Sequence, residues 1–186
     1  IAKWNGSAWS ALGSGMNDII DALAFGPNGA LYAGGAFWTA GGVTANCIAQ
    51  WNGVSWSTLG VGIGTMGGIK TISFGLDGQL YVGGKFEKAG GVTMPDRGAV
   101  WNGASWLPLD VNIQDTLAYF YTMVFDLYGR LYVGGAWTGS TALSATVTVS
   151  TTGNTGQGAA PVLTFTGPVT VWQLKNYTTG KVIYFN

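Results

Sequence analysis

The chain contains no histidine and a single cysteine, Cys47, among its 186 residues. Without histidine, neither a Ser-His-Asp nor a Cys-His catalytic arrangement can form, and a zinc site with imidazole ligands is excluded. One cysteine cannot form a disulfide within its own chain, so cysteine usage does not indicate the compartment. We expect Cys47 to be a small buried residue rather than a nucleophile.

Charged residues are scarce as well. Lys and Arg number 8, Asp and Glu number 8, and together they make up 9% of the chain, so the net charge is zero. Neutralising phosphates requires a basic surface, and this composition therefore argues against a nucleic-acid partner. Gly, Asn, Thr and Ser interrupt the charge-free stretches, and none reaches the ~20 apolar residues of a membrane-spanning helix. We expect no membrane partner either.

What the sequence does contain is a repeat with a period of about 50 residues. A motif that opens with Trp-Asn-Gly and closes with Trp occurs at residues 4–9, 51–56 and 101–106. A second motif, which begins with Phe and ends with Gly-Gly, interleaves with it at residues 25–35, 74–84 and 125–135. Three copies of two motifs at one period indicate a repeat architecture.

Each motif predicts a β-hairpin. In the first motif, Asn-Gly supplies the positive φ values of a tight turn between two outer strands. In the second, residues 21–25 alternate into a Gly-containing turn and continue as residues 31–33, which predicts two inner strands. The double glycine permits close backbone approach where strands crowd. Four strands per ~50 residues are typical of one β-propeller blade.

The repeats begin with an unaccompanied outer pair and end with an unaccompanied inner pair at residues 121–137. Such staggering closes a propeller when the first outer strands complete the last blade. About three blades are too few, because known rings need at least about four. We therefore predict an all-β fold of about three four-stranded blades at residues 1–140, with the ring completed by a homo-oligomer, a dimer being favoured over a trimer.

The Leu-Tyr-Ala-Gly-Gly of residues 31–35, followed by a Trp-containing outer strand, resembles kelch and galactose-oxidase-type propellers. The resemblance covers residues 1–137. The kelch consensus usually has a Tyr/Asp pair where this chain has Trp-Asn-Gly, which leaves the subfamily open. Residue 1 is Ile and the first segment matches an internal repeat, so we expect the sequence to begin inside a larger architecture, as in a fragment or a processed product.

Residues 141–186 predict a β-strand appendage, either a partial β-sandwich or an oligomerisation segment, with strands near residues 144–150, 162–165 and 181–185. An exposed edge at the last of these would pair with another chain. Residues 165–168 and 174–181 resemble the carboxy-terminal part of long-tailed bacteriophage tail proteins of the distal-tail type. That resemblance implies a truncated chain of virion structural or host-attachment origin, in the virion or outside the cell.

Most acidic residues fall in or beside the connections of one predicted propeller face. They are Asp18, Asp21, Glu87, Asp96, Asp110 and Asp115, with Lys70, Lys88 and Arg97 nearby. The simpler interpretation is that loops carry most charges. The functional one is a divalent-cation site built from Asp18, Asp21, Asp110 and Asp115, with oxygen ligands that suit Ca²⁺, Mn²⁺ or Mg²⁺, or with zinc at a subunit interface. In a regular strand Asp18 and Asp21 would face opposite sides.

For ligand binding, the candidates are Trp38, Trp137, Glu87, Asp96 and Arg97. We expect the tryptophans of the Trp-Asn-Gly motif to pack between blades instead, because they recur once per blade.

Three functions are consistent with these patterns. The first is a virion- or tail-like structural or binding module that recognises a glycan or cell-surface partner through propeller loops. The second is a metal-dependent hydrolase of phosphoesters or sulfate esters, with Asp110, Asp115 and Asp18 as catalytic candidates. The third is a multivalent lectin, which requires equivalent sites in each blade, whereas the loops at residues 38–42 and 87–91 differ. We expect a non-catalytic protein.

Overall fold

The computed structural model describes residues 1–64, 67–109 and 119–136, together with the backbone of short strands between residues 146 and 185. Every secondary-structure element in these residues is a β-strand, so the all-β expectation is confirmed for them. The chain divides into two compact units, Ile1–Gly139 and Ser140–Asn186, each of which is considered by itself.

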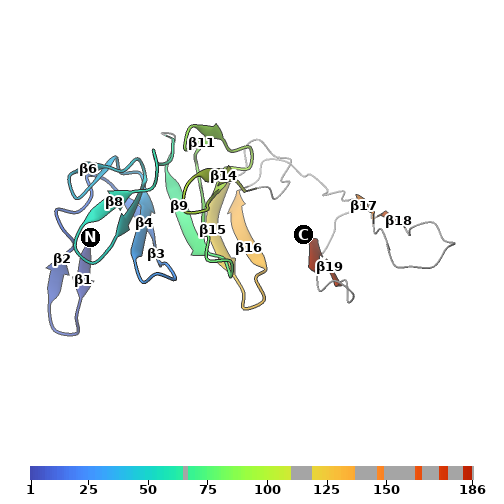
Figure 1. Ribbon diagram of the computed structural model, residues 1–186, viewed down its shortest axis with the longest axis horizontal. Coiled ribbons are helices and arrows are strands. Elements are labelled where there is room, and N and C mark those ends of the chain that lie inside the picture. The colour runs from blue at the N-terminus through green and yellow to red at the C-terminus, as the bar shows by residue number, and fades with distance from the viewer. Residues whose placement is uncertain are drawn as a thin grey trace. The chain divides into compact units, whose positions relative to one another are not determined.

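Two four-stranded antiparallel sheets form the centre of the first unit (Figure 1). The first sheet has the order β3 (Ile20–Phe25), β4 (Leu31–Gly35), β7 (Ile48–Trp51) and β8 (Trp56–Thr58). The second sheet has the order β9 (Ile69–Phe74), β10 (Leu80–Gly84), β13 (Gly98–Trp101) and β14 (Trp106–Pro108). In both sheets an inner hairpin lies beside the outer hairpin that follows it along the chain, as the repeat predicts.

A two-stranded sheet lies on either side of this pair in the sequence. Before the first sheet comes β1 (Ala2–Trp4) with β2 (Trp9–Ala11), and after the second comes β15 (Tyr119–Phe125) with β16 (Leu131–Ala136). By sequence the first pair is an outer hairpin and the second an inner one. Each is therefore half of the four-stranded pattern.

The two complete sheets share one register. Leu31 lies opposite Trp51 where β4 meets β7, and Leu80 lies opposite Trp101 where β10 meets β13. The register between the inner strands shifts near the start of β3, of β9 and of β15, so each copy of the first strand carries an irregularity at the same end. The repeat thus extends from sequence to hydrogen-bonding pattern.

Short hairpins occupy the connections that the sequence suggested to be plain loops. They are β5 (Thr39–Ala40) with β6 (Val43–Thr44), and β11 (Lys88–Ala89) with β12 (Val92–Thr93). Isolated bridges from Met16 to Ala40 and from Ile63 to Ala89 tie each hairpin to the segment that precedes its sheet. The connection therefore has the same supported backbone in both repeats.

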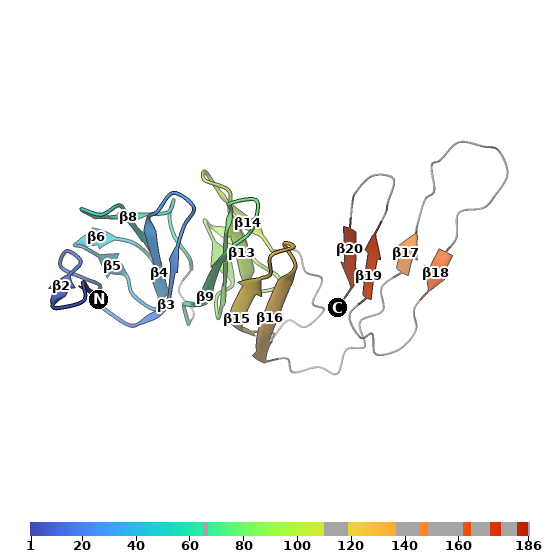
Figure 2. The same ribbon diagram turned by 90° about the horizontal axis from the view of Figure 1, so that it is seen from below.

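Successive sheets pack through their first strands, and Figure 2 shows β3, β9 and β15 following one another. Glycine permits this approach. A Cβ on Gly34 would lie 2.6 Å from the side chain of Ile69, and one on Gly83 would lie 2.6 Å from that of Phe120. The expected role of the double glycine is therefore confirmed. The largest buried cluster, which includes Ile48, Ile69 and Val82, lies between the two complete sheets.

The Trp-Asn-Gly turns differ from the predicted tight turn in one respect. Only the glycine has positive φ, which is 100° at Gly53, whereas the asparagine does not. Asn52 acts through its side chain, because its Oδ1 accepts hydrogen bonds from the amides of Val54 and Ser55, both at 2.9 Å. Asn5 and Asn102 accept equivalent bonds. The asparagine is thus an acceptor that organises a four-residue turn.

The described residues of the second unit form two antiparallel strand pairs. They are β17 (Thr146–Thr148) with β18 (Val162–Thr164), and β19 (Trp172–Lys175) with β20 (Val182–Phe185). Among the described strands, β20, at the segment expected to pair with another chain, pairs with β19.

The turn geometry yields a stability prediction. Asn52→Ala removes the acceptor of both amide hydrogen bonds and should lower the free energy of unfolding by about 1 kcal/mol, measured by denaturant titration. Asn52→Asp keeps an acceptor oxygen and should retain most of that stability. Equal losses in the two variants would contradict the acceptor role.

Candidate functional site

The acidic residues of the predicted cation site are not gathered at one point. Asp21 lies at the irregularity of β3, where its Oδ2 accepts a hydrogen bond from Nζ of Lys70 at 2.7 Å. Asp18 is exposed, and its Oδ1 accepts the Ile19 amide at 2.7 Å. In the part of the chain that the structure describes, no group of three or more Asp, Glu or Cys side chains could hold a metal ion. Asp110 and Asp115 lie outside the described residues, so a site that includes them stays a prediction.

Two basic residues, Arg97 and Lys85, pack on one aromatic ring. The guanidinium of Arg97 lies 4.8 Å from the ring centre of Tyr119, and Nζ of Lys85 lies 5.0 Å from the same ring. Arg97 also lies 3.7 Å from the exposed carboxylate of Glu87. Cation–π contacts of this kind fix the orientation of the cation. Asp96, another binding candidate, is buried.

Trp38 is the exposed binding candidate with the most rigid support. Its side chain is 45% exposed, and the side chain of Phe37 beside it is fully buried. The amide of Trp38 donates to Oδ1 of Asn17 at 2.9 Å, and its carbonyl accepts the amide of Ala45 at 2.8 Å. The ring therefore projects from a fixed backbone. Trp137 lies outside the described residues.

Two of the motif tryptophans join successive repeats, as predicted. Trp56 is 5% exposed, and its Nε1 donates to the Leu12 carbonyl at 2.9 Å. Trp106 is 3% exposed, and its Nε1 donates to the Leu59 carbonyl at 3.1 Å. The third copy differs, because Trp9 is 69% exposed.

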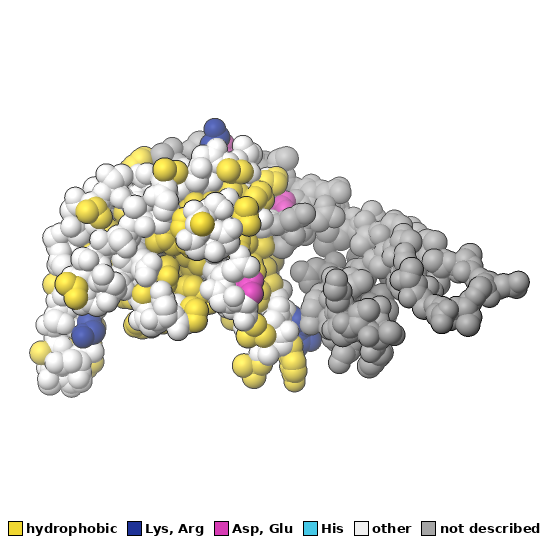
Figure 3. All heavy atoms as spheres, in the orientation of Figure 1, with side chains coloured by type: hydrophobic (Ala, Val, Ile, Leu, Met, Phe, Trp, Pro, Cys, Tyr) yellow, Lys and Arg dark blue, Asp and Glu magenta, His cyan; other side chains and the backbone are white. Residues whose placement is uncertain are grey.

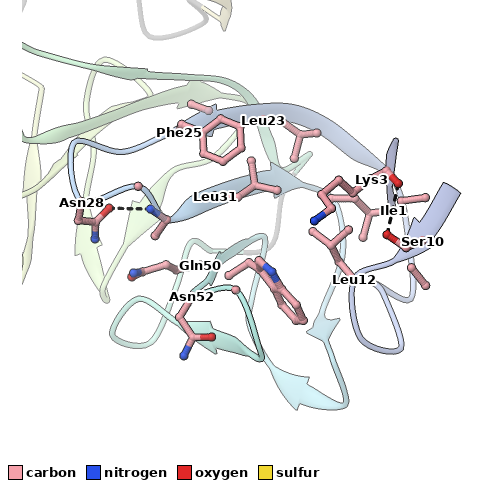
Figure 4. Close-up of a pocket in the computed structure, with 17 residues that line it drawn as sticks. Ile1, Lys3, Ser10, Leu12, Leu23, Phe25, Asn28, Leu31, Gln50 and Asn52 are labelled. Carbon is pink, nitrogen blue, oxygen red and sulfur yellow. Dashed lines mark hydrogen bonds between the residues drawn. The ribbon is translucent and has the colours of Figure 1, made fainter. Parts of the chain in front are cut away.

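A pocket of about 820 Å³ opens between the β1–β2 pair and the first sheet (Figure 4). Its side chains are mostly apolar, with polar groups at the margin. The lining includes Ile1, Leu12, Leu23, Phe25, Leu31 and Trp51, with Lys3, Ser10, Asn28 and Gln50. Phe25 is 72% exposed and Leu23 52% exposed, and Figure 4 shows both on the β3 side. Sequence reasoning missed this pocket, although Phe25 belongs to a repeated motif.

A second polar cluster lies at the turn between β9 and β10. The Tyr81 hydroxyl donates to Oδ2 of Asp77 at 2.9 Å, and the Gln79 amide donates to Oδ1. Burial and the nearby carboxylate raise the pKa of Tyr81 to about 12. Burial alone would raise the pKa of Asp77, but the hydrogen bonds outweigh it and lower the pKa. These bonds fix the turn and leave the carboxylate with its partners.

Comparison with known proteins does not identify a family for this chain. No protein-family model, no curated protein and no solved structure matches the chain. In the described residues no helix is long and apolar enough to cross a membrane. Function must therefore be argued from the residues and their arrangement.

Burial of Cys47 yields a prediction about pH. Desolvation, followed by the negative charge of Asp18, raises the pKa of the Cys47 thiol from 9.0 to about 11. Above pH 9 the thiol ionises in the unfolded chain before it does so in the folded one. The free energy of unfolding should therefore fall as pH rises from about 9 to about 11.

Denaturant midpoints of the unmodified chain and of Cys47→Ala across this interval measure the effect. The unmodified chain should lose more stability than the variant, which lacks the titrating thiol. Parallel curves would contradict a buried, protonated thiol.

Proposed function

We propose that residues 1–139 are kelch-like β-propeller blades, and that the chain is a non-catalytic structural or binding module of a virion or tail-like assembly. Its loops on one face would recognise a glycan or a cell-surface partner. The blade assignment is supported by two four-stranded sheets of one register, stacked through their first strands. In propellers, four-stranded blades likewise follow one another around a central channel.

The binding role is supported by two equivalent connections that have the same backbone hydrogen bond but different exposed side chains. The amide of Ala45 donates to the carbonyl of Trp38, and the amide of Met94 donates to that of Glu87, both at 2.8 Å. The same connection thus presents an indole in one repeat and a carboxylate in the next. Variable side chains on a rigid scaffold are typical of binding loops.

Trp38 supports a glycan or a similarly amphipathic partner. Its ring is a flat apolar surface with one hydrogen-bond donor, and it is held by the backbone bonds described above. Glu87 and Arg97 in the next repeat provide charged groups. Because the two loops differ, a single composite surface is favoured over equivalent lectin sites. The virion setting rests on the sequence resemblance at residues 165–168 and 174–181.

Binding to a glycan panel and to whole bacterial cells tests this proposal. Trp38→Ala should weaken binding at least about tenfold, the scale of a central aromatic contact residue. Val54→Ala is the matched control, since Val54 is 84% exposed in a turn between outer strands and should have no effect. Absence of binding, or equal binding by both variants, would contradict recognition through this loop.

A further inference from the structure

The contacts between successive repeats follow a pattern that occurs twice within the chain. Tyr32 packs edge-on against Phe74 at 5.1 Å between ring centres, and Tyr81 packs in the same way against Phe125 at 4.7 Å. The indole of one repeat donates to the leucine carbonyl of the preceding repeat, from Trp56 to Leu12 and from Trp106 to Leu59. The interface between the two complete sheets thus has one aromatic pair and one indole hydrogen bond. The contact of the β1–β2 pair with the first sheet has the indole bond, and the contact of the second sheet with the β15–β16 pair has the aromatic pair.

Half of this pattern is left over at each end of the first unit. At the first end, Trp9 of β2 is 69% exposed and Phe25 of β3 is 72% exposed. After the second sheet, Tyr132 is 48% exposed, and its hydroxyl reaches Asp126 as that of Tyr81 reaches Asp77. Leu109 occupies the position of Leu12 and Leu59, and no tryptophan among the described residues donates to its carbonyl. The two ends therefore carry complementary halves of one interface.

The strands at the two ends are complementary in the same sense. β1 pairs only with β2, and β16 pairs only with β15, among the strands described. Each leaves one row of backbone amides and carbonyls available for a further strand. In the complete sheets, the edges that correspond to these two are joined, as β4 to β7 and as β10 to β13.

We propose that a second copy of this chain completes the β15–β16 pair with its own β1–β2 pair. Transferring the register of the complete sheets places Leu131 opposite Trp4, Tyr132 opposite Lys3, and Val133 opposite Ala2 of the second copy. This inference rests on the blade arrangement of the proposed function and names the partner that the arrangement requires.

The remaining contacts of the interface then follow from the repeat. Trp9 of the second copy donates its indole hydrogen to the Leu109 carbonyl of the first. Phe25 of the second copy packs on Tyr132 of the first, as Phe74 packs on Tyr32. Gly134, at the position of Gly34 and Gly83, admits the first strand of the next sheet. Each exposed apolar group at one end thus has a defined neighbour at the other.

The repeat also indicates which segment fills the pocket beside β3. Its lining residues Leu23 and Phe25 stand at the positions of Ile72 and Phe74, which pack on the inner hairpin of the first sheet. In the corresponding place beside β1 and β2, the described residues of this copy contain no inner hairpin. We therefore assign the pocket to the β15–β16 pair of another copy rather than to a small molecule.

The number of copies follows from closure. A head-to-tail contact either closes a ring or continues as a filament. With about three blades per chain, two copies make a ring of about six, within the range of about four to eight that propellers adopt. Three copies would make about nine. For a ring built from residues 1–136, we therefore infer one further copy, joined at both ends.

Cysteine cross-linking tests the register. Ala2→Cys and Val133→Cys chains are prepared separately and mixed under mild oxidation, in a background that keeps the buried Cys47. Opposed residues of paired strands lie within disulfide reach, so a covalent dimer should form in the mixture and in neither sample alone. The control Ala2→Cys with Tyr132→Cys is shifted by one residue and faces the opposite side of the strand, so it should give none.

Two further measurements keep the outcome decisive if a cysteine variant folds poorly. Light scattering of the unmodified chain should give twice the 19.3 kDa of one copy. Trp9→Ala and Phe25→Ala should raise the dimer dissociation constant at least about tenfold, while Val54→Ala should not change it.

A monomeric mass, a larger assembly or equal cross-linking in the shifted control would overturn the proposal, and so would pairing with some other protein in place of a second copy. If Trp38-dependent glycan binding persists while the chain is monomeric, this inference alone fails. If the dimer forms with the predicted register and no ligand binds, the binding role fails and the assembly stands.

Discussion

The packing of β9 on Gly34 and of β15 on Gly83 sets the spacing between successive sheets in the first unit. A Cβ at either position would come within 2.6 Å of a neighbouring side chain, so no other residue permits the same approach. Because this spacing is fixed, the other contacts between repeats form at equivalent positions. The Tyr–Phe pairs and the indole hydrogen bonds recur at equivalent positions because the sheets are held at one distance.

The scarcity of charge agrees with this construction. Much of the apolar surface of the two complete sheets packs against another sheet. Figure 3 shows few charged side chains on the face it displays. Exposed hydrophobic residues occur in turns, as at Leu127 and Tyr128 in the turn that precedes β16. Several of the charged groups contact residues on a neighbouring strand or sheet, such as Lys70 with Asp21 and Arg97 with Tyr119.

Much of the strand pattern could be predicted from the sequence, because Trp-Asn-Gly and Leu-Tyr-x-Gly-Gly repeat with a regular period. The small hairpins of β5 with β6 and of β11 with β12 could not, since strands of two residues have no alternation to detect. The predicted cation site illustrates a second limit. Asp21 reaches Lys70 on the next sheet, and such pairing depends on how sheets stack rather than on spacing along the chain. The pocket was missed because it lies between the β1–β2 pair and the first sheet, and its lining depends on how these elements pack rather than on the order of residues.

The edge strand β16 affects what a newly synthesised chain can pair with. Its residues, Leu131–Ala136, include neither a charge nor a proline, which are the devices that usually discourage a strand edge from joining others. A free edge of this kind accepts any extended segment that reaches it first. In the proposed dimer, the local concentration of folded chains during synthesis, more than the folding rate of each chain, would then decide between ordered assembly and aggregation.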